Sequence, residues 1–257
     1  MINDYSEMKR YELKYTISSS VASEIRDYIR DFFSLDEHVP PGETQYTVNS
    51  LYFDTPELSF YYDTKFRKLT RYKLRVRYYG DRPTDSVWTE IKYRNSSVIW
   101  KTRHRMLFKE WPDFFQSRLS VKEEPVMKER MDSFEEMIFF HDARPVLHVS
   151  YVREPYVTQL EEYGRITFDR HLKYSLAKES TDLSLHRENM LYYDDPGTSK
   201  HYESPVILEI KVETLVPFWV IDIVRTFGLV QRGFSKYCYG LDNNREFTSP
   251  ARNPFFA

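Results

Sequence analysis

Charged and apolar side chains alternate along several stretches of this 257-residue chain. Arginine binds phosphate oxygens in bidentate fashion, lysine acts as a compact positive charge, and carboxylates bind hard divalent cations. The pattern therefore has the chemistry of a site for a phosphate chain with Mg²⁺ or Mn²⁺. The charged residues that share one parity are Arg10, Glu12 and Lys14; Lys73, Arg75 and Arg77; Glu90, Lys92 and Arg94; Lys101, Arg103 and Arg105; Arg165 and Asp169; and Glu209, Lys211 and Glu213.

A solvated face of an antiparallel sheet is the alternative explanation of each such stretch. Two features favour a different arrangement. The charged parity is almost wholly Arg, Lys and Glu, and the opposite parity is apolar enough to need cover from helices. If about eight strands close into a barrel, the charged parity faces its interior, which is costly without a polyanion and a metal. For single residues the alternatives stay open: Arg75 and Arg77 as surface charges, Glu90 and Glu213 as ion-pair partners or metal ligands, and Asp169 as a turn cap.

The elements that must position these residues are mostly strands. We expect an α+β fold, an antiparallel eight-stranded β-barrel with flanking helices, in one domain over residues 1–257. The expected strands are Lys9–Thr16, Thr47–Phe53, Thr70–Tyr79, Ser86–Arg94, Val98–Phe108, Pro145–Arg153, Gly164–Asp169 and Val206–Glu213. The expected helices are Ser18–Phe33, Val126–His141 and Pro217–Phe227, the first with serine caps and the last opened by proline.

The composition excludes several other classes of protein. Lys and Arg number 37 and Asp and Glu 39, so the net charge of −2 indicates neither a nucleic-acid nor a membrane partner. The chain has no GxGxxG or GxxxxGK[ST] motif, and its single cysteine, Cys238, rules out an internal disulfide and a CxxC zinc site. With no apolar segment of transmembrane length and no signal-peptide pattern, we expect a soluble, cytoplasmic protein without direct membrane insertion.

Taken in order, these motifs resemble the VTC domain, the polyphosphate polymerase branch of the triphosphate tunnel metalloenzymes. "RYELKY" is similar to the opening strand of that superfamily, usually Glu-x-Glu-x-Lys. The pieces that resemble the VTC branch run across nearly the whole chain: "VNSLYFDTPELSFYYD", "KLRVRYYG", "WTEIKYR", "PVLHVSYVREPY", "RITFDRHLKY", "VILEIKVET" and "RGFSKYCYG". The resemblance implies a stand-alone, bacterial-type member, without the sensing domain and transmembrane segment of the eukaryotic proteins.

The resemblance also implies an activity and a site. The family transfers the γ-phosphate of ATP to a growing polyphosphate chain inside a basic tunnel, with Mn²⁺ or Mg²⁺. We expect catalytic roles for Lys14, Arg75, Arg77, Lys92, Arg153, Arg165 and Lys236, substrate binding by Arg10, Lys101, Arg103, Tyr151, Lys211, Arg232 and Ser235, and metal ligation by Glu209 and Glu12. Of these residues, the family's motifs match Lys14, Arg75, Arg77, Lys92, Arg153, Arg165, Glu209, Ser235 and Lys236, and Arg232 stands near a family lysine. Arg10 stands where many members of the superfamily have a glutamate, which shifts metal ligation to Glu12 or Glu209. We expect Lys73 to be solvated at the tunnel rim.

Three functions remain open at this point. The first is the polymerase, with ATP and polyphosphate as partners and a membrane protein as a further partner for the product. The second is a triphosphatase on the same tunnel, with Glu12 or Glu90 orienting the water. The third is a non-catalytic module that binds polyphosphate or a phosphorylated partner. A single-stranded nucleic-acid binder would need exposed aromatics beside the cations and a basic charge balance.

Overall fold

The computed structural model describes residues 11–96, 98–111, 133–159, 163–178, 180–185, 187–192, 205–213 and 216–244. Arg10 and the expected helical residues 126–132 lie outside the described residues, so their predicted roles are not addressed by the structure. Within the described part, no helix combines the length and the hydropathy needed to cross a membrane.

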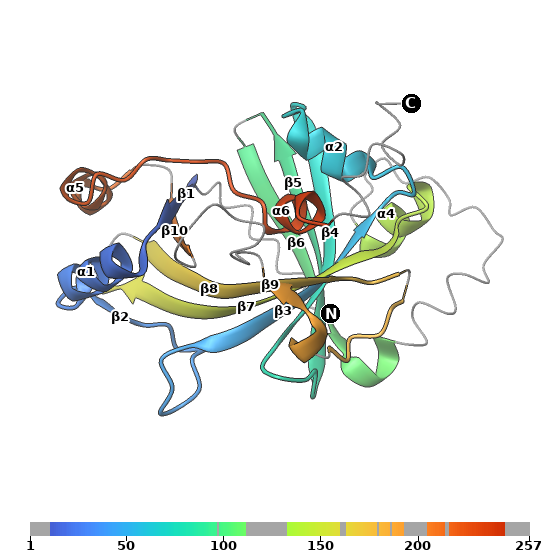
Figure 1. Ribbon diagram of the computed structural model, residues 1–257, viewed down its shortest axis with the longest axis horizontal. Coiled ribbons are helices and arrows are strands. Elements are labelled where there is room, and N and C mark those ends of the chain that lie inside the picture. The colour runs from blue at the N-terminus through green and yellow to red at the C-terminus, as the bar shows by residue number, and fades with distance from the viewer. Residues whose placement is uncertain are drawn as a thin grey trace. The chain divides into compact units, whose positions relative to one another are not determined.

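The expected α+β fold with eight antiparallel strands and flanking helices is confirmed. Hydrogen-bonded neighbours follow the order β1-β10-β8-β7-β3-β4-β5-β6 (Figure 1). These strands are β1 (Tyr11–Ile17), β3 (Tyr46–Asp54), β4 (Thr70–Tyr79), β5 (Ser86–Asn95), β6 (Val98–Leu107), β7 (Arg144–Thr158), β8 (Gly164–Leu176) and β10 (Val206–Val212). Two short strands join the same sheet, β2 (Phe33–Leu35) on β7 and β9 (Leu191–Tyr192) on β8.

The first and third predicted helices are shorter in the structure than the sequence predicts. The helices are α1 (Ser19–Ile29), α2 (Ser59–Lys65), α4 (Phe134–Phe140), α5 (Phe218–Thr226) and α6 (Lys236–Asp242), with 3₁₀ turns η1 (Phe108–Glu110) and η2 (Arg187–Asn189). The first predicted helix ends at Ile29 instead of Phe33, because Phe33 pairs with Thr158 in the sheet. In the described part of the second, a capping box at Ser133 begins the helix. The third is confirmed to within one residue at each end.

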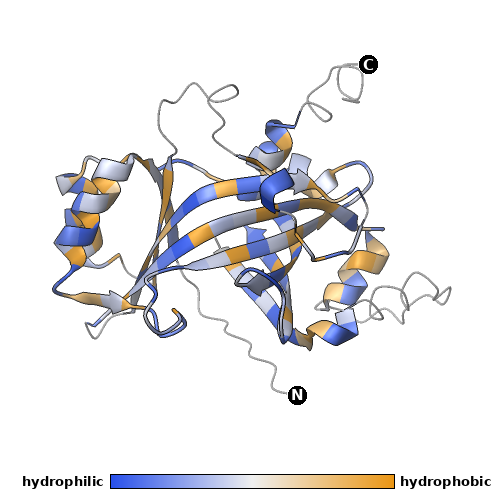
Figure 2. Cartoon of the chain, turned by 60° about the horizontal axis from the view of Figure 1, so that its bottom comes forward, coloured by the Kyte–Doolittle hydropathy of each residue, from blue (hydrophilic) through white to orange (hydrophobic). Residues whose placement is uncertain are grey.

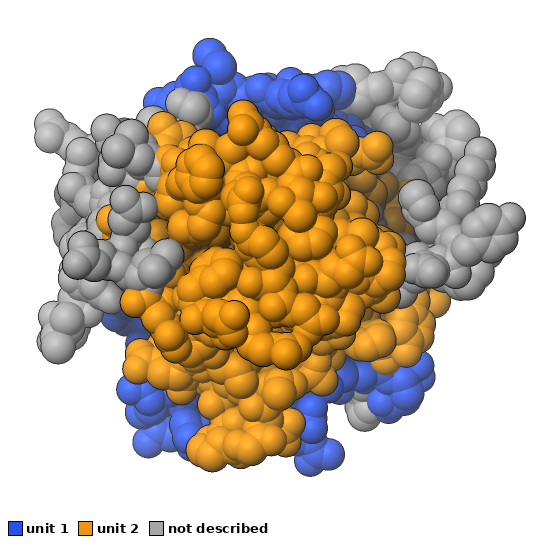
Figure 3. Space-filling model, turned by 90° about the vertical axis from the view of Figure 1, so that its left-hand side faces the viewer, with its two compact units in different colours: residues 1–7, 49–149, 174–190 blue, residues 8–48, 150–173, 191–257 orange. Residues whose placement is uncertain are grey.

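Two compact units make up the described chain, within residues 49–149 and 174–190 and within residues 8–48, 150–173 and 191–257 (Figure 3). In the first unit, the apolar parity of β4 and β5 packs into a core with Phe60 of α2 and Met137 of α4. Gly80, which adopts a positive φ of 82°, ends β4, and its carbonyl accepts a hydrogen bond from Asn49.

In the second unit, the apolar parity of β10, which includes Leu208 and Ile210, packs against α1 and α5. The Tyr28 hydroxyl of α1 donates to the Asp222 carboxylate of α5. Gly164, the first residue of β8, lies against the indole ring of Trp219. A Cβ atom at this position would come 2.5 Å from that ring, so the close contact requires glycine. In both units, therefore, the helices cover the apolar face of the strands and leave the charged parity on the opposite face. Hydrophobic and hydrophilic bands alternate along the strands in Figure 2.

Candidate functional site

In the first unit, four cations converge on one buried carboxylate. Register places Arg75 of β4 and Arg103 of β6 on either side of Glu90 of β5. The shortest nitrogen–oxygen distances to the Glu90 carboxylate are 2.6 Å for Arg75, 3.3 Å for Arg103, 3.6 Å for Lys101 and 3.7 Å for Arg77. We call these five residues the Glu90 cluster. Among the residues that the structure describes, these four cationic side chains all lie within 4 Å of the one Glu90 carboxylate.

Three lysines form the next rung of the same face across β4, β5 and β6. Lys73, Lys92 and Lys101 are Cα partners across β4, β5 and β6. Like charges directly opposite one another are destabilising in a sheet. The rung therefore adds to the positive charge beside the Glu90 cluster, and an anion bound there would relieve the repulsion. Lys73, expected to be solvated, is half-buried.

Electrostatic interactions keep Glu90 ionised. Burial favours the protonated carboxyl, but Arg75 and Arg77 outweigh burial and hold the pKa of Glu90 well below its usual range. Tyr52 of β3, which accepts a hydrogen bond from Arg75 at 3.1 Å, has its pKa lowered by the same two arginines against the effect of burial. The Nε atom of Arg77 donates to Ser50 Oγ at 3.3 Å. Motif comparison had left Tyr52 and Ser50 out, although both share one parity of β3.

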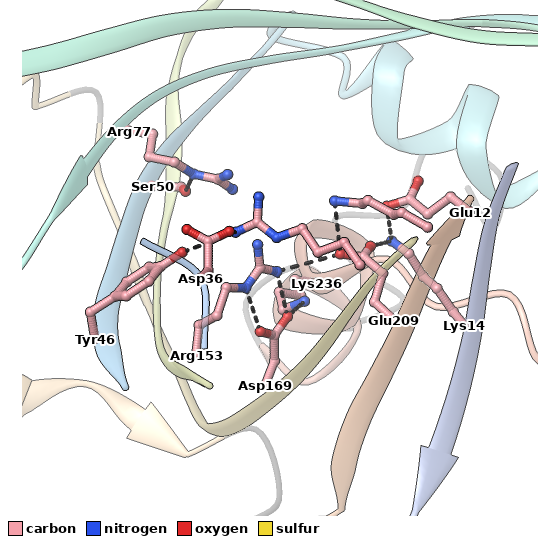
Figure 4. Close-up of polar contacts among 12 residues, drawn as sticks. Glu12, Lys14, Asp36, Tyr46, Ser50, Arg77, Arg153, Asp169, Glu209 and Lys236 are labelled. Atoms are coloured by element: carbon pink, nitrogen blue, oxygen red, sulfur yellow. Dashed lines mark hydrogen bonds and ion pairs between the residues drawn. The ribbon is translucent and has the colours of Figure 1, made fainter. Parts of the chain in front are cut away.

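The second unit has a cluster of almost balanced charge, which Figure 4 shows in part. The Lys14 ammonium lies 3.0 Å from Glu209 and 3.4 Å from Glu12. Glu209 also pairs with Lys211 at 3.3 Å and with Arg153 at 3.4 Å. Burial favours neutral forms here as well. The cations Lys14 and Lys211 nevertheless lower the pKa of Glu209, and the two glutamates raise the pKa of Lys14.

Asp169 is the other carboxylate of this cluster. It accepts hydrogen bonds from Arg153 Nε at 2.7 Å and Nη2 at 2.8 Å, and from Lys236 Nζ at 2.6 Å (Figure 4). Burial disfavours the ionised forms of both Asp169 and Arg153. The positive charge of Arg153 nevertheless lowers the pKa of Asp169, and the negative charge of Asp169 raises the pKa of Arg153. Tyr151 lies beneath both cations, 5.3 Å and 4.5 Å from its ring centroid. We call Glu12, Lys14, Tyr151, Arg153, Asp169, Glu209, Lys211 and Lys236 the Glu209 cluster.

The turn-cap hypothesis for Asp169 is wrong, because β8 continues to Leu176 and Asp169 is fully buried within it. Its parity on the strand was the signal that placed it with the cations.

Three further predicted residues have separate contacts in this unit. Arg165 pairs with Asp36 at 3.1 Å and donates to the Tyr46 hydroxyl at 3.4 Å. Ser235 caps α6 by accepting from the Cys238 amide, which positions Lys236 in the first turn. The backbone amide of Arg232 donates to the Lys14 carbonyl, and the Arg232 side chain is exposed.

Glu12 and Glu209 are the carboxylates available for a divalent metal. Across the described ranges, no group of three or more His, Cys, Asp or Glu side chains is arranged to hold one. Mg²⁺ is commonly bound through one or two carboxylates together with substrate phosphates. The two glutamates, already joined by one cation at Lys14, fit that kind of site, in which phosphate oxygens complete the coordination.

The family model for the VTC domain matches residues 9–243, so the chain belongs to the VTC domain family. No curated protein matches the sequence.

Several solved structures are similar over most of the chain. A candidate adenylate cyclase from Bacillus halodurans is 13% identical, with 89% of this chain and 96% of that chain covered and a TM-score of 0.46. A candidate adenylyl cyclase from Hippeastrum, described as having a dominant triphosphatase activity, is 13% identical, with 91% of this chain and 96% of that chain covered and a TM-score of 0.45. The Mimivirus capping enzyme triphosphatase is 10% identical, with 87% of this chain and 90% of that chain covered and a TM-score of 0.37. These structures are too distant to indicate the function of this chain, and the family assignment rests on the family model.

Proposed function

We propose that this protein is a metal-dependent phosphotransferase, a polyphosphate polymerase that moves the γ-phosphate of ATP to a growing polyphosphate chain. The observation that carries the proposal is the Glu90 cluster, in which four cations surround a single buried carboxylate in a chain of the VTC domain family. Cationic side chains gathered this closely, with Arg77 buried and Arg75 largely buried, repel one another, and an anion of several charges would offset that repulsion. A phosphate chain is an anion of this kind. A cytoplasmic location and a membrane-protein partner for the product stay predictions.

The two clusters have different roles in this proposal. Arg75, Arg77 and Arg103 bind phosphate oxygens, with Lys92 and Lys101 beside them as compact charges. Glu12 and Glu209 hold Mn²⁺ or Mg²⁺, which supplies Lewis-acid stabilisation of the charge on a transferring phosphoryl group. Arg153 and Lys236, held in place by Asp169, are fixed donors for phosphate oxygens. Phosphoryl transfer depends mainly on positioning and charge stabilisation, which these side chains provide.

Hydrolysis of a triphosphate is the second candidate. Glu12 supports it, because this carboxylate pairs with Lys14 and its side chain is 11% exposed, so it can orient a water molecule. Glu90 suits that role less well, since four cations hold its carboxylate and keep its pKa low.

Product analysis separates these functions. The wild-type protein, incubated with ATP and Mn²⁺, is expected to form long polyphosphate on a gel. Free phosphate without long chains would indicate the triphosphatase, and neither product together with retained triphosphate binding would indicate a binding module.

Arg75→Ala is expected to lower turnover about 100-fold or more, because a preorganised donor is lost. Arg144→Ala, which removes an exposed arginine paired with Asp142, is the control and should leave turnover unchanged. Equal activity of both variants would refute the role of the Glu90 cluster.

The affinity for inorganic tripolyphosphate is expected to fall between pH 7 and pH 9. Burial and the neighbouring guanidinium groups of Arg103 and Arg75 lower the pKa of Lys101 to about 8, against the opposing effect of Glu90. The Lys101 ammonium is therefore lost as pH rises through this range, and one cation disappears from the cluster. Dissociation constants measured from pH 7 to 9.5 should rise less in Lys101→Gln than in the wild type. Lys65→Gln, on α2, is the control and should show the same rise as the wild type. A wild-type rise in Lys101→Gln would contradict the assignment.

A further inference from the structure

An aromatic group lies on the charged face of the first unit, one rung beyond Glu90. Trp88 of β5 shares its parity with Glu90 and Lys92, and it is the Cα partner of Arg77 on one side and Arg105 on the other. Its indole ring is half-buried and is not part of the hydrophobic core on the helix side. A large, partly exposed aromatic ring among arginines is therefore a feature that core packing does not explain.

Tyr79 and Arg103 complete this group. The ring of Tyr79, the last residue of β4, meets Trp88 edge to face at 5.2 Å between centroids. The Arg103 guanidinium lies 4.6 Å from the Trp88 ring centroid and 5.8 Å from that of Tyr79, and it donates to the Tyr79 hydroxyl at 3.1 Å. Indole, phenol and guanidinium present π surfaces, and a guanidinium plane can itself stack on a nucleobase.

The spacing suits a nucleotide. Residues two apart on a strand are separated by about 7 Å, so Trp88 lies about that far along β5 from Glu90 and about twice as far from Lys92. A triphosphate bound by the Glu90 cluster and the lysine rung would leave a short stretch of molecule, the ribose, between its phosphates and an aromatic surface. Arg103 belongs to both groups, since it contacts Glu90 as well as Trp88.

We propose that Trp88, Tyr79 and Arg103 form a base-stacking subsite, which binds the base of the nucleoside triphosphate that the Glu90 cluster holds by its phosphates. This inference rests on the proposed function, because it takes the Glu90 cluster as the phosphate site. Stacking recognises the flat face that all bases share, and the subsite therefore favours nucleotides over inorganic triphosphate without selecting strongly among bases.

The test compares two probes, ATP and inorganic tripolyphosphate, each measured by calorimetry with excess Mg²⁺. Stacking on an aromatic side chain contributes about 1–3 kcal/mol per base, so Trp88→Ala should weaken ATP binding about 5- to 150-fold. Tripolyphosphate has no base, and its affinity should change less than about 2-fold. Trp88→Phe keeps an aromatic surface and should retain most of the affinity for ATP.

In the wild type, ATP should quench tryptophan fluorescence more than tripolyphosphate does, and Trp88→Phe should lose this difference.

Trp100→Ala is the matched control. Trp100 lies on the neighbouring strand β6 but on the opposite parity, stacked on Tyr93 at 5.2 Å, and it is expected to leave both affinities unchanged. Equal losses for ATP and tripolyphosphate in Trp88→Ala would mean that Trp88 only positions Arg103, which overturns the proposal. Unchanged affinity for ATP in Trp88→Ala also overturns it.

The failure of the subsite and the failure of the proposed function are distinguishable. If the wild type forms polyphosphate from ATP and Trp88→Ala weakens neither ligand, the subsite is wrong and the function stands. If Trp88→Ala selectively weakens ATP but the wild type does not turn ATP over, the subsite stands and the enzyme function is wrong. Absence of binding of both probes to the wild type overturns both.

Discussion

Glu209→Gln is expected to lower metal-dependent turnover about 1,000-fold, since a metal ion contributes several kcal/mol of transition-state stabilisation. Glutamine preserves the shape of the side chain but removes the negative charge that holds a divalent cation. The same change leaves Lys14, Lys211 and Arg153 with less compensating charge, because all three contact this carboxylate. The variant should therefore bind tripolyphosphate at least as tightly as the wild type in the absence of metal, while it loses catalysis.

Glu154→Gln is the control for this experiment. Glu154 is also a buried, ion-paired glutamate of the second unit, but it pairs with Arg26 of α1 and Arg170 of β8 on the helix-covered side. Both variants lose a buried ion pair, so both are expected to be less stable, and only Glu209→Gln should lose turnover. Turnover and metal requirement are measured across a titration of Mn²⁺. If Glu209→Gln keeps wild-type turnover and an unchanged metal requirement, the assignment of Glu209 as a metal ligand is wrong.

The charged face was predictable from the sequence because the period of a strand is strictly two. Strand β4 begins at Thr70 and ends at Tyr79 as predicted, and its apolar parity is buried against helices as expected. The partners of each charge were not predictable, because they depend on register across two hairpins. Glu90 was left open between metal ligand and ion-pair partner, and the structure surrounds it with four cations.

Elements fixed by distant contacts were missed. Helix α2 was not predicted. Sequence rules recognise the start of a helix by a residue whose side chain caps it, and Leu58, the residue before α2, makes no such hydrogen bond. Its first amides are instead bonded by Asp54 of β3, which accepts from Phe60 and Tyr61. The strand that corresponds to β7 was predicted to end at Arg153. It continues to Thr158, and the Pro155 carbonyl accepts a hydrogen bond from the Asp36 amide.

Asp169→Asn is expected to reduce the free energy of unfolding by about 3–5 kcal/mol, the usual result of removing one partner of a buried ion pair. Asparagine has the shape of aspartate, but it leaves the Arg153 guanidinium and the Lys236 ammonium without the carboxylate that now contacts both. Asp142→Asn removes a carboxylate from an exposed pair with Arg144 and should change stability by less than about 0.5 kcal/mol. Urea unfolding of the three proteins measures these differences.

Two further measurements separate the electrostatic explanation from a general packing defect. The folded-state pKa of Asp169 is lowered, so its stabilising contribution is complete above the unfolded-state pKa and is lost as pH falls through the folded-state value. The stability difference between wild type and Asp169→Asn should therefore be full at neutral pH and shrink as the pH falls below about 4. Inorganic tripolyphosphate supplies the missing negative charge to Arg153 and Lys236, and it should raise the melting temperature of Asp169→Asn more than that of the wild type. A stability loss that neither acid nor tripolyphosphate reduces would point to packing and would contradict the role of Asp169 as the counterion of these two cations.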